Sequence, residues 1–196
     1  MKRRFAMVLF SLLLLIPLTY ISTAEAATTT PGAFVPLSPS RLLDTRDGTG
    51  GPKAAVAAHG TVSLTVAGHG GVPATGVGAV VLNVTVTGPT TAGFVTVYPT
   101  GSTRPTASNL NFTAKQTIPN LVVAKVGTGG AINLYNGSSG TVHLVADVAG
   151  YYLGGTPSTP GAFVPLSPSR LLDTRDGTGG PKAAVAAHGT VSLTVA

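Results

Sequence analysis

Residues 78–87 read GAVVLNVTVT, and their pattern indicates the fold class of the chain. Its apolar side chains stand at every second position from Val80 to Val86, with Asn83 and Thr85 between them. Successive side chains of a strand point to opposite faces, so this alternation predicts a strand with one buried face. Valine and threonine dominate the stretch, which is typical of a half-buried pleated surface.

Similar short runs lie on both sides, at 62–66, 94–98, 110–113, 120–126, 131–135 and 142–148. Glycine-rich turn signals separate them, and Asn136-Gly137 is the strongest; we expect hairpins at such loops. The one helix-like stretch after residue 26, Ala54–Ala58, is too short to stand alone. About eight short strands without helices predict an all-β fold, an antiparallel β-sandwich that is jelly-roll-like. A closed barrel is the alternative.

The N-terminus has the three parts of a secretory signal peptide. Lys2-Arg3-Arg4 form a basic head, residues 5–18 form an apolar run, and Ala24 and Ala26 are small residues suited to cleavage. We predict a signal-peptide helix in residues 1–26 and a secreted, extracellular or cell-surface protein. An uncleaved anchor is the alternative, but the run is shorter than the roughly 20 residues that span a bilayer. Membrane contact is therefore expected only through the signal peptide.

The composition excludes several classes of protein. There are no cysteines, which rules out a disulfide framework and a thiolate metal site. The formal net charge is +6, but the basic residues beyond the signal peptide are scattered and form no run. A nucleic-acid surface needs clustered basic residues, so no nucleic-acid partner is expected. The 43% of hydrophobic residues are sufficient for a core without cross-links.

An identical sequence occurs twice. Residues 31–67 and 160–196 match letter for letter, and they begin 129 positions apart. This spacing fits a tandem array of whole domains. We divide the chain into a signal peptide (1–26), a complete β-sandwich repeat (27–153), a linker (154–159) and the truncated N-terminal part of a second repeat (160–196).

The second copy stops inside an expected strand, which favours a fragment of a longer array. We expect residues 160–196 to carry the same strands as residues 31–67. If the chain ends at residue 196, they could fill the corresponding place in a neighbouring molecule. Self-association through 160–196 into head-to-tail oligomers is therefore a further expectation.

The loop after residue 40 holds the densest group of charges. It contains Asp44 and Asp47 beside Arg41 and Arg46. A glycosidase needs one carboxyl group with a raised pKa, whereas neighbouring arginines keep carboxylates ionised. We therefore predict a structural loop held by an Arg–Asp pair and side-chain caps. A calcium site is the alternative. No catalytic, cofactor-binding or metal-binding residue is predicted, and no enzyme is expected.

Four tyrosines are candidates for stacking on sugar rings, namely Tyr98, Tyr135, Tyr151 and Tyr152. Glycan-binding sandwiches often present exposed aromatic rings in this way. The alternative is that these rings close the ends of the hydrophobic core.

Four landmarks carry a resemblance to a known family: RLLDTR at 41–46, NVT at 83–85, SNLNF at 108–112 and DVAGYY at 147–152. With them the chain resembles the roughly 130-residue repeat domain of secreted and cell-surface proteins of high-GC Gram-positive bacteria. The resemblance covers 34–152 fully and 163–196 in part. It implies an exported β-rich accessory module, found in tandem or beside wall-active domains, and it carries over no ligand and no catalytic residue.

Two functions are compatible with these observations. The first is a structural or adhesive repeat module of the cell envelope without catalytic activity, with cell-wall polymers or glycans as partners. The second is a carbohydrate-binding accessory module of a secreted hydrolase.

Overall fold

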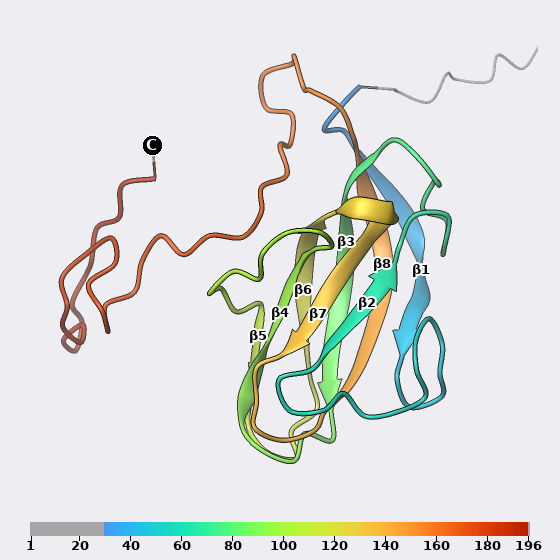
Figure 1. Cartoon of the computed structure of the whole chain (residues 1–196). Coiled ribbons are helices and arrows are strands. Elements are labelled where there is room, and N and C mark those ends of the chain that lie inside the picture. Colours follow the sequence, from blue (N-terminus) through green and yellow to red (C-terminus); the bar gives the residue numbers. More distant parts are fainter. Residues whose placement is uncertain (1–29, 196) are drawn as a thin grey trace, which may run out of the picture.

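The computed structural model describes residues 30–195, which form a two-layer β-sandwich followed by an extended C-terminal segment (Figure 1). The predicted signal-peptide helix, residues 1–26, lies outside the described residues. The eight strands are β1 (Phe34–Asp44), β2 (Thr61–Thr65), β3 (Val77–Thr87), β4 (Gly93–Pro99), β5 (Leu110–Phe112), β6 (Ile118–Lys125), β7 (Ala131–Asn136) and β8 (His143–Leu153). A 3-10 turn, η1 (Thr128–Gly130), precedes β7.

The strand order is that of a jelly roll. One sheet has the order β1-β8-β3-β6 and the other β2-β7-β4-β5, and every neighbouring pair is antiparallel. The sequence prediction of an all-β antiparallel sandwich is therefore confirmed. The expected hairpin at Asn136-Gly137 was wrong, because β7 and β8 lie in different sheets. Only β4 and β5 are both consecutive in sequence and paired.

The core lies between the sheets and is built by the alternation seen in the sequence. On β3, Val80, Leu82, Val84 and Val86 are fully buried and face the second sheet, where Leu134 on β7 is also fully buried. Burying a side chain of this size contributes about 1.5–3 kcal/mol. The period of two in the sequence thus becomes the inner face of one sheet.

Strand β1 is a strand that the sequence patterns did not predict. It contains Pro36 and Pro39, so the alternation of the partly buried Val35 and Leu37 is too short to be recognised as a strand. Proline lacks the backbone N–H of a ladder hydrogen bond, so it is tolerated mainly on edge strands. β1 is an edge strand, and its pairing with β8 shifts register between Pro36 and Ser40.

The second copy of the repeated sequence is folded differently from the first. Residues 160–195 form no strand, and only the isolated bridge between Asp173 and Thr178 is present. The expectation that this segment carries the same strands as 31–67 was therefore wrong for this chain. The reason is physical: β1 and β2 pair with β8 and β7, and the second copy has no such partners of its own among the described residues.

Candidate functional site

The charged loop begins at the end of β1 and centres on Asp44, the last residue of that strand, whose side chain is 2% exposed. Arg46 donates from Nε to Oδ1 at 2.8 Å and from Nη2 to Oδ2 at 2.6 Å. The Arg46 backbone N–H also donates to Oδ1, at 3.0 Å, and Arg41 Nη1 donates to Oδ2 at 2.9 Å. These hydrogen bonds, above all those from the Arg46 side chain, hold the pKa of Asp44 well below its usual range.

Arg41 also joins the loop to the sheet. Its Nε donates to Asp147 Oδ1 at 2.8 Å, and Asp147 lies on β8 opposite Arg41. The pKa of Arg41 is raised, chiefly by this hydrogen bond. Asp47 caps the turn instead: its Oδ1 accepts from the Thr49 backbone N–H at 2.8 Å, which lowers its pKa. The four charged side chains of the loop therefore hold the turn and attach it to β8.

The arrangement leaves few carboxylate oxygens free to coordinate a calcium ion. Both oxygens of Asp44 already accept hydrogen bonds from arginines. Among residues 30–195, no three His, Asp, Glu or Cys side chains come together in a way that could hold a metal ion. The carboxylates stay ionised, whereas a general acid must carry a proton at neutral pH.

The four candidate tyrosines are placed in four different surroundings. Tyr151 faces the hydrophobic core between the sheets. Tyr98 lies on the outer face of the second sheet, yet it is buried. The loop before β5 covers this face, where Thr96 Oγ1 donates to the Ala107 carbonyl at 2.6 Å. Neither buried ring presents a face to a ligand, so only Tyr135 and Tyr152 remain as accessible candidates.

Tyr135 is the centre of a cluster on the outer face of the second sheet, which we call the Tyr135 cluster: His59, Phe94, Arg104 and Tyr135. The Arg104 guanidinium lies 4.0 Å from the centroid of the Tyr135 ring. Phe94 is tilted against the same ring with centroids 6.3 Å apart, and His59 Nδ1 is 3.2 Å from the tyrosine hydroxyl. Arg104 covers one face of the ring, and this cation–π contact holds the guanidinium in place.

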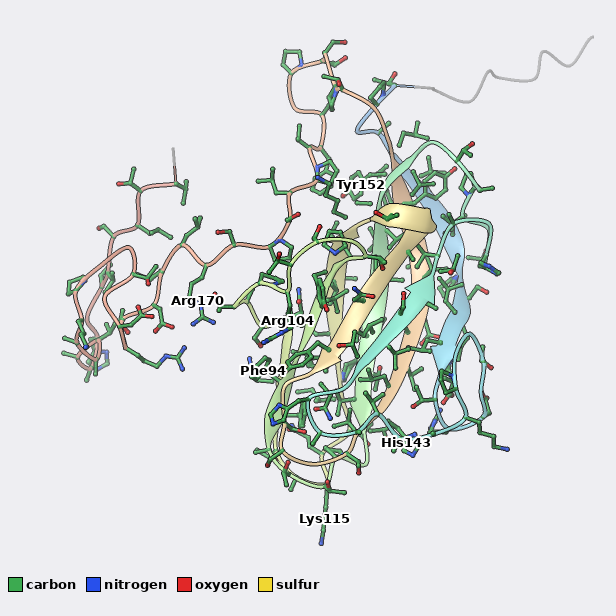
Figure 2. The ribbon with its side chains drawn as sticks, in the orientation of Figure 1. Phe94, Arg104, Lys115, His143, Tyr152 and Arg170 are labelled. Atoms are coloured by element: carbon green, nitrogen blue, oxygen red, sulfur yellow. The ribbon has the colours of Figure 1, made fainter. Side chains whose placement is uncertain are left out.

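A hollow of about 310 Å³ opens beside this cluster. It is lined by Phe94, Arg104, Thr106, Ala107, Ser108 and Asn111, with Arg170 and Arg175 of the second copy. Figure 2 shows Phe94, Arg104 and Arg170 on the same side of the molecule. The hollow therefore combines an aromatic ring, a guanidinium and small polar side chains, which are the groups that recognise acidic sugars or other planar anions.

Tyr152 is part of a separate aromatic contact. Its ring lies 5.2 Å from that of Phe34 on β1 and 4.1 Å from that of Phe163 in the second copy, measured between centroids. Phe34 and Phe163 are equivalent positions of the repeat. Tyr152 is therefore in contact with both copies rather than open to a sugar.

Sequence reasoning named Tyr135 but missed Phe94, Arg104 and His59. Phe94 could have been found, because it shares the outer face of β4 with Thr96 and Tyr98. Arg104 and His59 lie in loops, and no local pattern connects them to Tyr135. Only the pairing of β7 with β2 and β4 brings them together.

Comparisons of the chain with protein-family models, with curated proteins and with solved structures found no match. Within the described part of the chain, no helix has the length and apolar character needed to cross a membrane.

Proposed function

We propose that this chain is an exported structural or adhesive repeat module of the cell envelope, without catalytic activity. The observation that supports the proposal is that both connections of the repeat unit lie at one end of the sandwich. Phe34 at the start of β1 pairs with Tyr152 at the end of β8, so the chain enters and leaves the unit at one end. A following unit attaches at that end and leaves the opposite end of the sandwich free.

The free end carries exposed basic side chains. It is formed by the loops 45–60, 88–92, 113–117 and 137–142, and it presents Lys53 and Lys115. Lys115 has φ of 64° in its turn and projects away from the sandwich (Figure 2). A positive surface attracts anionic polymers at long range, which suits the anionic polymers of a bacterial cell wall.

The state of the carboxylates supports a role without catalysis. Asp44 and Asp47 are engaged in the loop, and Asp147 accepts from Arg41. Export is supported by the signal-peptide pattern of residues 1–26. The four landmark motifs and the resemblance to a surface repeat domain favour a location outside the cell.

Sedimentation with purified Gram-positive cell walls tests the proposal. We expect the chain from residue 27 to co-sediment with walls at low salt and to be released as salt screens the attraction. The double variant Lys53→Ala with Lys115→Ala should bind several-fold more weakly. Lys125→Ala, which removes an exposed lysine at the other end of the sandwich, is the matched control. If the chain is absent from wall and surface fractions, this proposal fails.

A second candidate, a carbohydrate-binding module, is favoured by the hollow beside the Tyr135 cluster. The guanidinium of Arg104 is held by Tyr135, and Phe94 offers an aromatic wall next to it. These groups suit a sugar that carries a carboxylate, because the guanidinium can pair with the anion while the ring packs against the pyranose.

A glycan array of neutral and acidic sugars distinguishes this candidate from the first. We expect acidic glycans to bind, and Phe94→Ala or Arg104→Ala to weaken that binding at least tenfold. Lys53→Ala should leave it unchanged, because Lys53 does not line the hollow. An array without binding, or binding that is indifferent to Arg104→Ala, would eliminate this second function.

A further inference from the structure

Strands β1 and β2 form one removable edge of the sandwich. β1 is the outer strand of the first sheet and pairs only with β8, and β2 is the outer strand of the second sheet and pairs only with β7. Residues 34–65 thus leave both sheets together without taking any interior strand with them. We call the surface that they cover, formed by β7 and β8, the β7–β8 edge.

The second copy carries the same side chains that the first copy packs against the β7–β8 edge. Leu193 is the equivalent of Leu64, and Leu171 is the equivalent of Leu42. Leu64 is 1% exposed and Leu42 is 6% exposed, whereas Leu193 is 36% exposed and Leu171 is 52% exposed. The second copy therefore exposes apolar groups that the first copy buries, and the β7–β8 edge is the surface that would bury them.

The start of the second copy already lies at the start of this edge. Phe34 pairs with Tyr152, and the ring of Phe163 also stacks on Tyr152 at 4.1 Å between centroids. The Phe163 backbone N–H donates to the carbonyl of Gly32 at 3.3 Å. The second copy thus meets the edge at the residue that matches the first paired residue of β1.

The direction in which the second copy follows β8 also suits antiparallel pairing with that strand. β8 runs towards Leu153, residues 154–162 can form a turn, and residues 163–173 would then run back along β8 as an antiparallel strand. This connection makes a simple hairpin of β8 with the second copy. Loop-closure entropy changes only slowly with loop length, so a turn of this size is not a strong obstacle.

The charged loop is already formed in the second copy. Arg175 donates to Asp173 through Nε at 2.9 Å and through Nη2 at 2.6 Å, as Arg46 does to Asp44. Arg170 is paired with Asp173 as well. A segment that holds this loop before it binds loses less conformational entropy on docking than an unstructured chain would.

We infer that residues 160–195 exchange with residues 31–67 on the β7–β8 edge of the same molecule. Because residues 160–195 are identical to residues 31–66, the contacts with β7 and β8 are the same in both states. The states differ mainly in their connections: residues 66–76 link the first copy to β3, and residues 154–162 link the second copy to β8. The first copy keeps one extra turn, in which the His69 backbone N–H donates to Val66. Residues 30–195 contain one β7–β8 edge for the two copies, so the copy that does not occupy it is available for other contacts.

Single and double substitutions in the full chain test this exchange. Leu64→Asp places a carboxylate in the core when the first copy is docked, and Leu193→Asp does the same for the second copy. With exchange, each single variant stays folded with a Tm within about 5 °C of the unaltered chain, whereas the double variant loses more than about 15 °C. If Leu64→Asp alone is as unstable as the double variant, the exchange does not occur.

The molecular mass of Leu64→Asp identifies the donor. A folded monomer in gel filtration with light scattering supports exchange within one molecule. A folded dimer or larger oligomer means that the second copy comes from a neighbouring molecule, which overturns the inference as stated.

Engineered cysteines give an independent test, because the natural chain has none. Ser63 pairs with Asn133 across β2 and β7, and Ser192 is the equivalent of Ser63. Asn133→Cys with Ser63→Cys should form an intramolecular disulfide when the first copy is docked. Asn133→Cys with Ser192→Cys should form one only through exchange.

The control for this disulfide experiment is Asn133→Cys with Ala186→Cys. Ala186 is the equivalent of Ala57, which contacts Asn136 at the other end of β7, so the second thiol lies in the same segment but away from residue 133 in the exchanged state. Exchange predicts at least tenfold more monomeric disulfide for Ser192→Cys than for Ala186→Cys. Equal yields, or no disulfide with Ser192→Cys while Ser63→Cys reacts, would overturn the inference.

Discussion

Residues 31–66 and 160–195 carry the same sequence in two environments, and only part of their structure is shared. The first copy forms two strands and the second forms none. Both copies nevertheless build the same loop: Asp44 bridges to Thr49 and Asp173 to Thr178, and Gly50 and Gly179 both have φ of 64°. The difference teaches that the loop is stabilised locally, whereas the strands depend on β7 and β8.

The largest expected effect comes from the part of the sandwich that has no duplicate. Leu134 on β7 is fully buried, and Leu134→Ala should cost about 3 kcal/mol of unfolding free energy through lost burial and a cavity. Leu193→Ala, in the undocked copy, should change it by less than about 0.5 kcal/mol. Urea denaturation followed by circular dichroism measures both. Similar losses for the two variants would mean that the second copy is packed after all.

The second-largest loss of stability is expected from changes in the charged loop that both copies form. A Cβ at Gly50 would lie 1.8 Å from the Leu42 carbonyl oxygen, and a Cβ at Gly179 would lie 1.9 Å from that of Leu171. Gly50→Ala together with Gly179→Ala should therefore cost about 2 kcal/mol, because a non-glycine residue is strained at this φ. The double variant is needed since either copy can supply the loop to the edge. Unchanged denaturation of the double variant would show that the loop is not required in either copy.

Acid should weaken the charged loop in both copies. We expect its effect on stability to be smaller than that of Gly50→Ala together with Gly179→Ala. The pKa of Asp44 is lowered in the folded state, so its contribution is fully present above the unfolded pKa of about 3.9 and is lost as the pH falls towards the folded pKa. Asp44→Asn with Asp173→Asn should therefore flatten the fall of Tm between pH 4 and pH 2 by a few degrees. Identical acid profiles for the variant and the unaltered chain would contradict this role.

The smallest effect comes from an ion pair that only the first copy makes. Arg41 pairs with Asp147 on β8, whereas Arg170 in the second copy pairs with Asp173 alone among the described acidic residues. Because Arg41 is 43% exposed, Asp147→Asn should cost no more than about 0.5 kcal/mol, and the difference should shrink in high salt. Thermal unfolding at low and high salt measures it, and a loss above about 2 kcal/mol would mean that this ion pair is a main anchor of β1.

The sequence was a good guide to β3 and β4 and a poor guide to β1. Alternation is visible where one face of a strand is buried, as from Val80 to Val86. β1 has Pro36 and Pro39, and its register shift between Pro36 and Ser40 interrupts the alternation that Val35 and Leu37 begin. The crossing of the chain between sheets after Asn136 was also missed. A glycine-containing turn shows that the chain bends, but not whether the next strand joins the same sheet.

Only one residue of the Tyr135 cluster could be predicted from the sequence. Tyr135 stands out as an aromatic residue in a short strand, but its partner Arg104 comes from the covering loop between β4 and β5. The contact forms because this loop lies across the outer face of the second sheet, where Thr96 Oγ1 donates to the carbonyl of Ala107. No property of Arg104 or its neighbours in the sequence indicates where that loop lies.

The sequence by itself determined the all-β class, the face of each regular strand that is buried, and the geometry of the loop shared by Asp44 and Asp173. These features depend on side-chain alternation and on hydrogen bonds within a few residues, which act wherever the segment lies. The tertiary structure decided which copy of 31–67 becomes strands, how the sheets are connected, and which side chains gather around Tyr135. Strand pairing satisfies backbone groups across long sequence distances, so an identical segment remains without strands until β7 and β8 are available to it.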